Sequence, residues 1–185
     1  MAKESQVIFD RNVIDFVTVA AEFCKLMEQA GAEEGKDRFT DTMLKVLPLL
    51  YVKALLLPPC ETMGDEPLEE GVREDDYEYV RQTAARLLGE SDVYLDVFLE
   101  DMKYSDTPIA KHISEDLADI YQDIKNFIFV FRQGLNRNMH DALVLCRENF
   151  RLYWGQKLVN TLRALHELKF SAEAGTEEDD DVFYD

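Results

Sequence analysis

Apolar residues recur along most of the chain at steps of three and four, the spacing that places side chains on one face of an α-helix. The most regular series runs from Ile113 to Phe131 without a fault. No segment has the sustained alternation expected of half-buried strands. The pattern predicts an all-α protein, an antiparallel bundle of about five or six helices. The clearest helices are expected over about residues 10–30, 37–57, 77–88, 108–134 and 137–168.

Proline, glycine and serine divide these helices. Pro48 lies inside the second helix and predicts a kink there, because its ring removes a backbone hydrogen bond. Residues 58–76, rich in proline, glycine and acid, are expected to form a long loop that is either mobile or functional. Ser91 is expected to cap a short helix in "SDVYLDVFLEDM". Pro108 suits the first turn of the next helix, and Gly155 is a candidate bend in the last one.

The 185 residues, 46% of them apolar, are enough for one domain with its own core. We expect that domain to occupy residues 1–170. Residues 171–185, "SAEAGTEEDDDVFYD", contain seven acidic residues and no basic one, which predicts a disordered acidic tail. Its terminal Phe183 and Tyr184 leave two roles open, a solubilising tail or a short docking peptide.

The net charge of −18 changes which partners are plausible. It opposes binding to phosphate backbones and anionic lipid, so we expect neither nucleic acid nor membrane as a partner. The longest apolar run is interrupted by Pro48 and Lys53 and is too short to span a bilayer. The N-terminus has no pattern of an export signal, which predicts a cytoplasmic protein.

Two charged stripes follow helical spacing near the centre and the end of the chain. Residues 132–169 carry seven basic and three acidic residues, a local charge of +4, so the remainder carries −22. A tight turn near residue 135 would set Asp119 level with Arg151. The same turn would set Asp123 level with Arg147, so ion pairs between the stripes are the favoured interpretation. The acidic stripe is Asp116, Asp119 and Asp123, and the basic stripe is Arg137, His140, Arg147 and Arg151.

Motifs of known chemistry are missing from the chain. No Glu-x-x-His pair supports a ferritin-like di-metal centre, and no two His or Cys residues have zinc-ligand spacing. No glycine-rich phosphate loop or Gly-x-Ser-x-Gly nucleophile motif is present. Cys24, Cys60 and Cys146 are interpreted as small structural residues. We therefore predict no cofactor and no catalytic or metal-binding residues.

Three stretches carry a resemblance: "LLGESDVYLDVFLEDM", "SEDLADIYQDIKNFIFVFRQG" and "NFRLYWGQKLVNTLRALHEL". Over most of residues 8–169 the chain resembles an all-helical bacterial family known only as a domain of unknown function. The resemblance implies the fold and a bacterial cytoplasmic setting, but no activity. That family often carries histidines after the Trp-Gly pair, where this chain has Gln156 and Lys157, which weakens any histidine metal site. The matching residues where a pocket would be sought are Asp116, Asp119, Tyr121, Asp123, Arg151, Trp154 and His166.

These observations favour an acidic helical-bundle module that binds another protein and has no catalytic activity. Its contact surface would be the basic stripe, the 58–76 loop or the tail. The alternative is a small-molecule or metal-dependent enzyme in which the acidic stripe faces a cleft with Arg147, Arg151 or His140. Mimicry of nucleic-acid charge is a third interpretation that the net charge permits.

Overall fold

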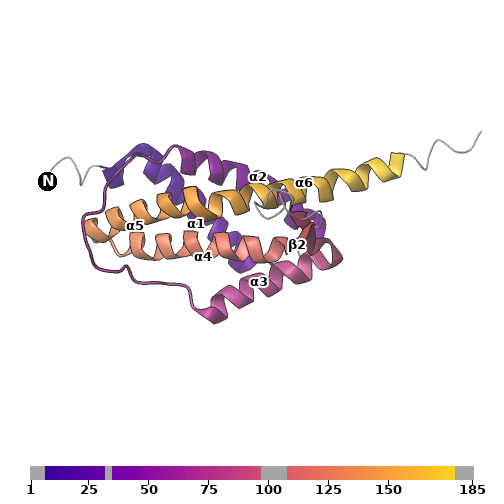
Figure 1. Cartoon of the computed structure of the whole chain (residues 1–185), viewed down its shortest axis with the longest axis horizontal. Helices are drawn as coiled ribbons and strands as arrows, with labels where there is room; N and C mark the ends of the chain where they lie inside the picture. The colour runs from indigo at the N-terminus through magenta and orange to yellow at the C-terminus, as the bar shows by residue number, and fades with distance from the viewer. Residues whose placement is uncertain (1–6, 32–34, 97–107, 178–185) are drawn as a thin grey trace, which may run out of the picture.

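The helices of this chain pack side by side in an elongated bundle (Figure 1). The computed structural model describes residues 7–31, 35–96 and 108–177, with side chains as far as residue 171. The predicted all-α bundle is confirmed. Its helices are α1 (Arg11–Gln29), α2 (Lys36–Leu55), α3 (Glu74–Leu88), α4 (Ile113–Arg132), α5 (Asn136–Asn149) and α6 (Gly155–Glu177).

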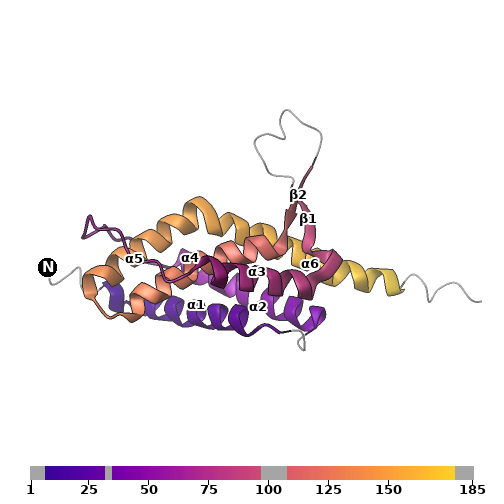
Figure 2. The ribbon, with the colours of Figure 1, turned by 90° about the horizontal axis from the view of Figure 1, so that it is seen from below.

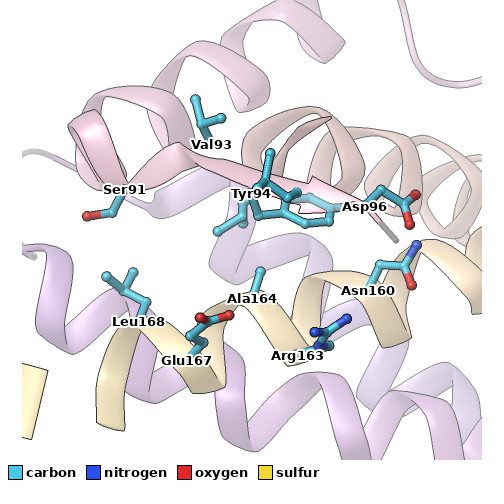
Figure 3. Close-up of a pocket in the computed structure, with 11 residues that line it drawn as sticks. Ser91, Val93, Tyr94, Asp96, Asn160, Arg163, Ala164, Glu167 and Leu168 are labelled. Atoms are coloured by element: carbon cyan, nitrogen blue, oxygen red, sulfur yellow. The ribbon is translucent and has the colours of Figure 1, made fainter. Parts of the chain in front are cut away.

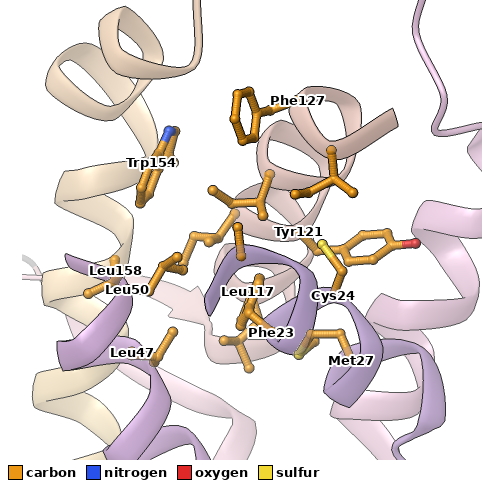
Figure 4. Close-up of a cluster of buried hydrophobic side chains, with 14 of the residues drawn as sticks. Phe23, Cys24, Met27, Leu47, Leu50, Leu117, Tyr121, Phe127, Trp154 and Leu158 are labelled. Atoms are coloured by element: carbon orange, nitrogen blue, oxygen red, sulfur yellow. The ribbon is translucent and has the colours of Figure 1, made fainter. Parts of the chain in front are cut away.

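Helix α4 lies at the centre of the bundle, in contact with α1, α3, α5 and α6. Its apolar residues at steps of three and four, among them Leu117, Ile120 and Ile124, are completely buried, which explains why this series is the most regular in the sequence. Figure 4 shows Leu117 together with Phe23 of α1 and other side chains of the same core. Burial of each large side chain contributes about 1.5–3 kcal/mol, so this core fixes the positions of the helices.

Helix α2 continues through Pro48. A proline has no N–H to donate to the preceding turn, and a kink at this point stays a prediction. The segment between α2 and α3 has no regular structure over residues 57–73, as predicted, although α3 begins at Glu74 rather than at Tyr77.

A two-stranded antiparallel hairpin replaces helix on both sides of residues 97–107, which lie outside the described residues. The prediction of a helix from Ser91 is wrong: Ser91 lies in a 3-10 turn, η2 (Gly89–Asp92), followed by β1 (Val93–Asp96). The prediction that a helix begins at Pro108 is also wrong, since β2 (Ile109–His112) precedes α4.

Pairing between the strands explains both errors, because strands this short show too little alternation to be recognised. Val93 pairs with His112 and Asp96 pairs with Ile109. The hairpin projects from the side of the bundle (Figure 2). Its inner residues therefore face helices that are far away in the sequence.

The last predicted helix consists of two helices joined by a π-helical turn, Phe150–Trp154. The N–H of Gly155 donates to the carbonyl of Phe150, five residues earlier, which is the hydrogen bond of a π-helix. A Cβ at residue 155 would come within 2.4 Å of that carbonyl oxygen. Gly155 therefore permits this close approach, and the irregularity predicted there is a wider turn.

Helix α6 reaches beyond the bundle at one end (Figure 1) and ends at Glu177. The boundary predicted at residue 170 thus falls inside this helix, and residues 178–185 of the predicted tail lie outside the described residues. Within the described part of the chain, no helix combines the length and apolar character needed to cross a bilayer.

Candidate functional site

The three aspartates of the acidic stripe contact the elements around one side of α4. Asp116 is buried, and Asp119 and Asp123 are half-buried. Their bonding partners come from β1, α3, α5 and α6. The spacing of three and four residues thus places them together, as predicted, at the edge of the core.

Lys157 of α6 neutralises two of these carboxylates. Its Nζ lies 2.5 Å from Oδ2 of Asp119 and 3.7 Å from Oδ1 of Asp116. Burial lowers the pKa of Lys157, but the hydrogen bond to Asp119 and the nearby negative charges outweigh burial and leave this pKa raised. Lys157 is therefore a charged ammonium that fixes α6 against α4, and it is unsuited to act as a general base.

Two tyrosines donate to the same carboxylates. The hydroxyl of Tyr94 donates to Oδ2 of Asp116, and that of Tyr77 donates to Oδ1 of Asp119 at 2.8 Å. Burial, and then the carboxylate acceptor, raise the pKa of both tyrosines. Burial also raises the pKa of Asp116, while Tyr94 and Lys157 oppose this shift. The network is thus a set of satisfied hydrogen bonds that holds β1, α3 and α6 to α4.

The predicted ion pairs with arginines are wrong. Among the described residues, Asp119 pairs with Lys157 rather than Arg151. Asp123 accepts a 2.7 Å hydrogen bond from Nδ2 of Asn149, and no described ion pair joins it to Arg147. The prediction assumed one continuous last helix, whereas the π-helical turn changes which residues of this segment face α4.

The basic stripe does not form one site with the acidic stripe. Arg137 is exposed beside Gly64, and Arg151 is exposed on the π-helical turn. Arg147 is half-buried near Cys60. His140 is buried, and its Nδ1 has no hydrogen-bond partner among the described residues.

The other sequence candidates have separate positions. Trp154 is completely buried, and its Nε1 donates to the carbonyl of Cys146 at 3.2 Å, so it belongs to the core (Figure 4). The hydroxyl of Tyr121 donates to Oε1 of Glu28 at 2.9 Å. His166 is exposed, and its ring lies against Phe170 with centroids 4.6 Å apart. The structure therefore brings the aspartates together but does not gather the remaining candidates around them.

Sequence reasoning missed the acidic anchors of the hairpin. Asp92 accepts from both the N–H and the hydroxyl of Ser114, each at 2.7 Å, and thereby caps the first turn of α4. The buried Asp96 pairs with Lys111 at 2.7 Å. The alternation of Asp92, Tyr94 and Asp96 with Val93 and Leu95 was the available signal, a polar face and an apolar face of one short strand.

A cavity of about 510 Å³ lies between this hairpin and α6 (Figure 3). Tyr94 contributes from β1, and Asn160 and Leu168 contribute from α6. Val93 and Leu95, at the edge of this cavity, are 50% and 57% exposed. We call this region the hairpin cavity. Within the part of the chain that the structure describes, no three His, Cys, Asp or Glu residues are grouped so that they could hold a metal ion.

The fold is thus that of a helical bundle with a projecting hairpin whose polar residues serve as anchors. Residues 7–171 match the family described as Domain of unknown function (DUF5063), and the chain belongs to that family. It is similar to protein BF1032 from Bacteroides fragilis, known from a crystal structure, with 56% sequence identity and a TM-score of 0.78. The match covers 89% of this chain and 96% of that one. No curated protein matches the chain.

Proposed function

We propose that this chain is a non-catalytic module that binds another protein, with the hairpin and the adjoining face of α6 as its contact surface. The observation that carries the proposal is the exposure of Val93, Leu95 and Ile109, at 50%, 57% and 45%, on an anchored hairpin beside the hairpin cavity. Exposed apolar side chains grouped next to a hollow are typical of interaction sites.

The anchoring of the hairpin supports this function. Asp92, Tyr94 and Asp96 bind Ser114, Asp116 and Lys111, so the inner face of the hairpin is fixed to the bundle. A surface that is already ordered loses little conformational entropy when a partner binds. The apolar outer residues are therefore presented in a fixed arrangement.

The free edges and the charge of the molecule indicate the partner's chemistry. Among the described residues the sheet has only two strands, so each strand leaves one edge unpaired. Such an edge accepts an extended segment through main-chain hydrogen bonds. The net charge of −18 favours a basic partner through electrostatic steering. The proposed partner is an extended segment of another protein that carries basic and apolar residues, encountered in the cytoplasm.

The alternative, an enzyme that uses the acidic stripe, has less support. Asp116 and Asp119 share Lys157 and accept from tyrosine hydroxyls, and the pKa values of Lys157, Tyr77 and Tyr94 are all raised. These shifts keep the donors protonated near neutral pH, where a general base must be able to accept a proton.

The test is affinity capture from cell lysate followed by reconstitution with the purified captured protein. The variant Val93→Thr/Leu95→Thr removes apolar surface while it keeps residues that favour strands. Leu152→Thr/Val159→Thr removes exposed apolar residues elsewhere and is the matched control. The expected result is a protein retained by the wild type and the control, lost with the hairpin variant, and bound more weakly as salt increases. Equal retention by both variants, or binding that is insensitive to salt, would contradict the proposal.

A further inference from the structure

A second cavity, separate from the hairpin cavity, lies between residues 67–70, α4 and α5. Its volume is about 470 Å³, within the range typical of small-molecule sites. Phe127, Val130 and Leu145 are among the apolar residues that line it. We call it the strap cavity, because residues 57–73 pass over this side of the bundle between α2 and α3.

The strap is held in place by side chains of the helices beneath it. Oδ1 of Asn126 accepts hydrogen bonds from the N–H groups of Gly71 and Val72, at 2.8 and 3.0 Å. Farther along, Oδ1 of Asp141 accepts from the N–H of Met63 at 2.6 Å. The wall that the strap gives to the cavity is therefore tied to α4 and α5 at both ends.

Asp123 is the member of the acidic stripe that lines this cavity. It differs from Asp116 and Asp119, which share the ammonium of Lys157. Its printed bond is to the neutral amide of Asn149, through Oδ1, and among the described residues no cation forms an ion pair with it. A carboxylate has about four acceptor positions, so Asp123 retains unused capacity toward the cavity.

The electrostatics of the site favour a positive ligand. Burial raises the pKa of Asp123, with the charge of Asp119 adding to this shift and the Asn149 hydrogen bond opposing it. A half-buried carboxylate without a cation loses much of its hydration and lacks the compensation that an ion pair gives. Glu69 and Glu70 also line the cavity, which disfavours anions.

We propose that the strap cavity binds a small organic cation, a primary amine with an apolar body. Its ammonium would pair with Asp123 while its body packs against Phe127, Val130 and Leu145. An ammonium donates up to three hydrogen bonds, which suits the free oxygen of Asp123 and the side-chain oxygens nearby. This site is independent of the protein-binding surface proposed for the hairpin.

Calorimetric titration of the full chain tests this site with three probes of similar shape: 2-phenylethylamine, 2-phenylethanol and 3-phenylpropanoate. We expect the amine to bind with one-to-one stoichiometry and at least ten times more tightly than the alcohol or the carboxylate. Asp123→Asn should weaken amine binding at least tenfold. Asp75→Asn removes the same charge at an exposed position and should leave affinity unchanged.

A second variant keeps the test independent of any effect of Asp123→Asn on folding. Leu145 is 47% exposed at the cavity, so Leu145→Lys is tolerated by the core and places a cation in the site. It should abolish amine binding in a protein whose circular dichroism and melting temperature match those of the wild type. Equal binding of amine and alcohol, no binding of the amine, or full affinity in both variants would overturn the proposal.

Discussion

At the scale of single residues, Lys157 compensates more buried negative charge than any other side chain described in detail above. Lys157→Met leaves Asp116 and Asp119 without their shared cation. Because Lys157 is itself partly exposed, we expect a loss of about 2 kcal/mol in the free energy of unfolding at pH 7, measured in urea. Lys45→Met removes an exposed pair with Asp41 and should cost less than about 0.5 kcal/mol.

The pH dependence of that loss has a definite sign. Burial raises the pKa of Asp116 in the folded state, so the folded protein gains stability as pH falls through the window between this pKa and that of the unfolded chain. Removal of Lys157 raises the pKa of Asp116 further. The difference in unfolding free energy between variant and wild type should therefore shrink from pH 7 towards pH 4; a constant difference would contradict this account.

Gly155 is defined by the absence of a side chain. A Cβ in Gly155→Ala would meet the Phe150 carbonyl and come within 2.9 Å of the Phe150 ring. We expect a loss of about 1–3 kcal/mol in unfolding free energy, although alanine normally favours helices over glycine. Gly31→Ala meets only one atom, at 3.8 Å, and serves as the control. Its unfolding midpoint in urea should match that of the wild type within about 0.5 kcal/mol.

At the scale of elements, Asp92 links the hairpin to the start of α4. Asp92→Ala removes the acceptor of the Ser114 N–H and hydroxyl, so we expect about 2 kcal/mol of destabilisation. Amide hydrogen exchange of β1 and β2 should accelerate more than exchange in the buried part of α4. Uniform acceleration across all elements would show that Asp92 does not anchor the hairpin specifically.

Most of the fold could be predicted because buried helices repeat the same spacing over many residues. The series from Ile113 to Phe131 is long enough to identify α4 without its neighbours. The four-residue strands are not, because Val93–Asp96 becomes a strand only through its pairing with residues 109–112. The position of the acidic stripe was predictable from one helix, but its partners Lys157 and Asn149 depend on the π-helical turn, which local sequence did not reveal.

At the scale of the whole molecule, the dominant property is a net charge of −18. Compact folding brings these charges closer together than they are in the unfolded chain, and added salt screens their repulsion. We expect the melting temperature to rise when sodium chloride is increased from about 10 mM to about 150 mM. A fall over this range would indicate that the internal ion pairs contribute more than the repulsion does.

The π-helical turn also has a consequence for how this protein tolerates changes of length. A π-helical turn contains one residue more than the α-helical turn it replaces. Deleting one residue there would restore a regular helix, yet it would rotate everything that follows by about 100° relative to the present arrangement. Lys157 would then leave Asp119, and Leu158 would leave the core. The extra residue thus sets the rotational phase of α6, and a length change in this turn must be compensated by an opposite change nearby.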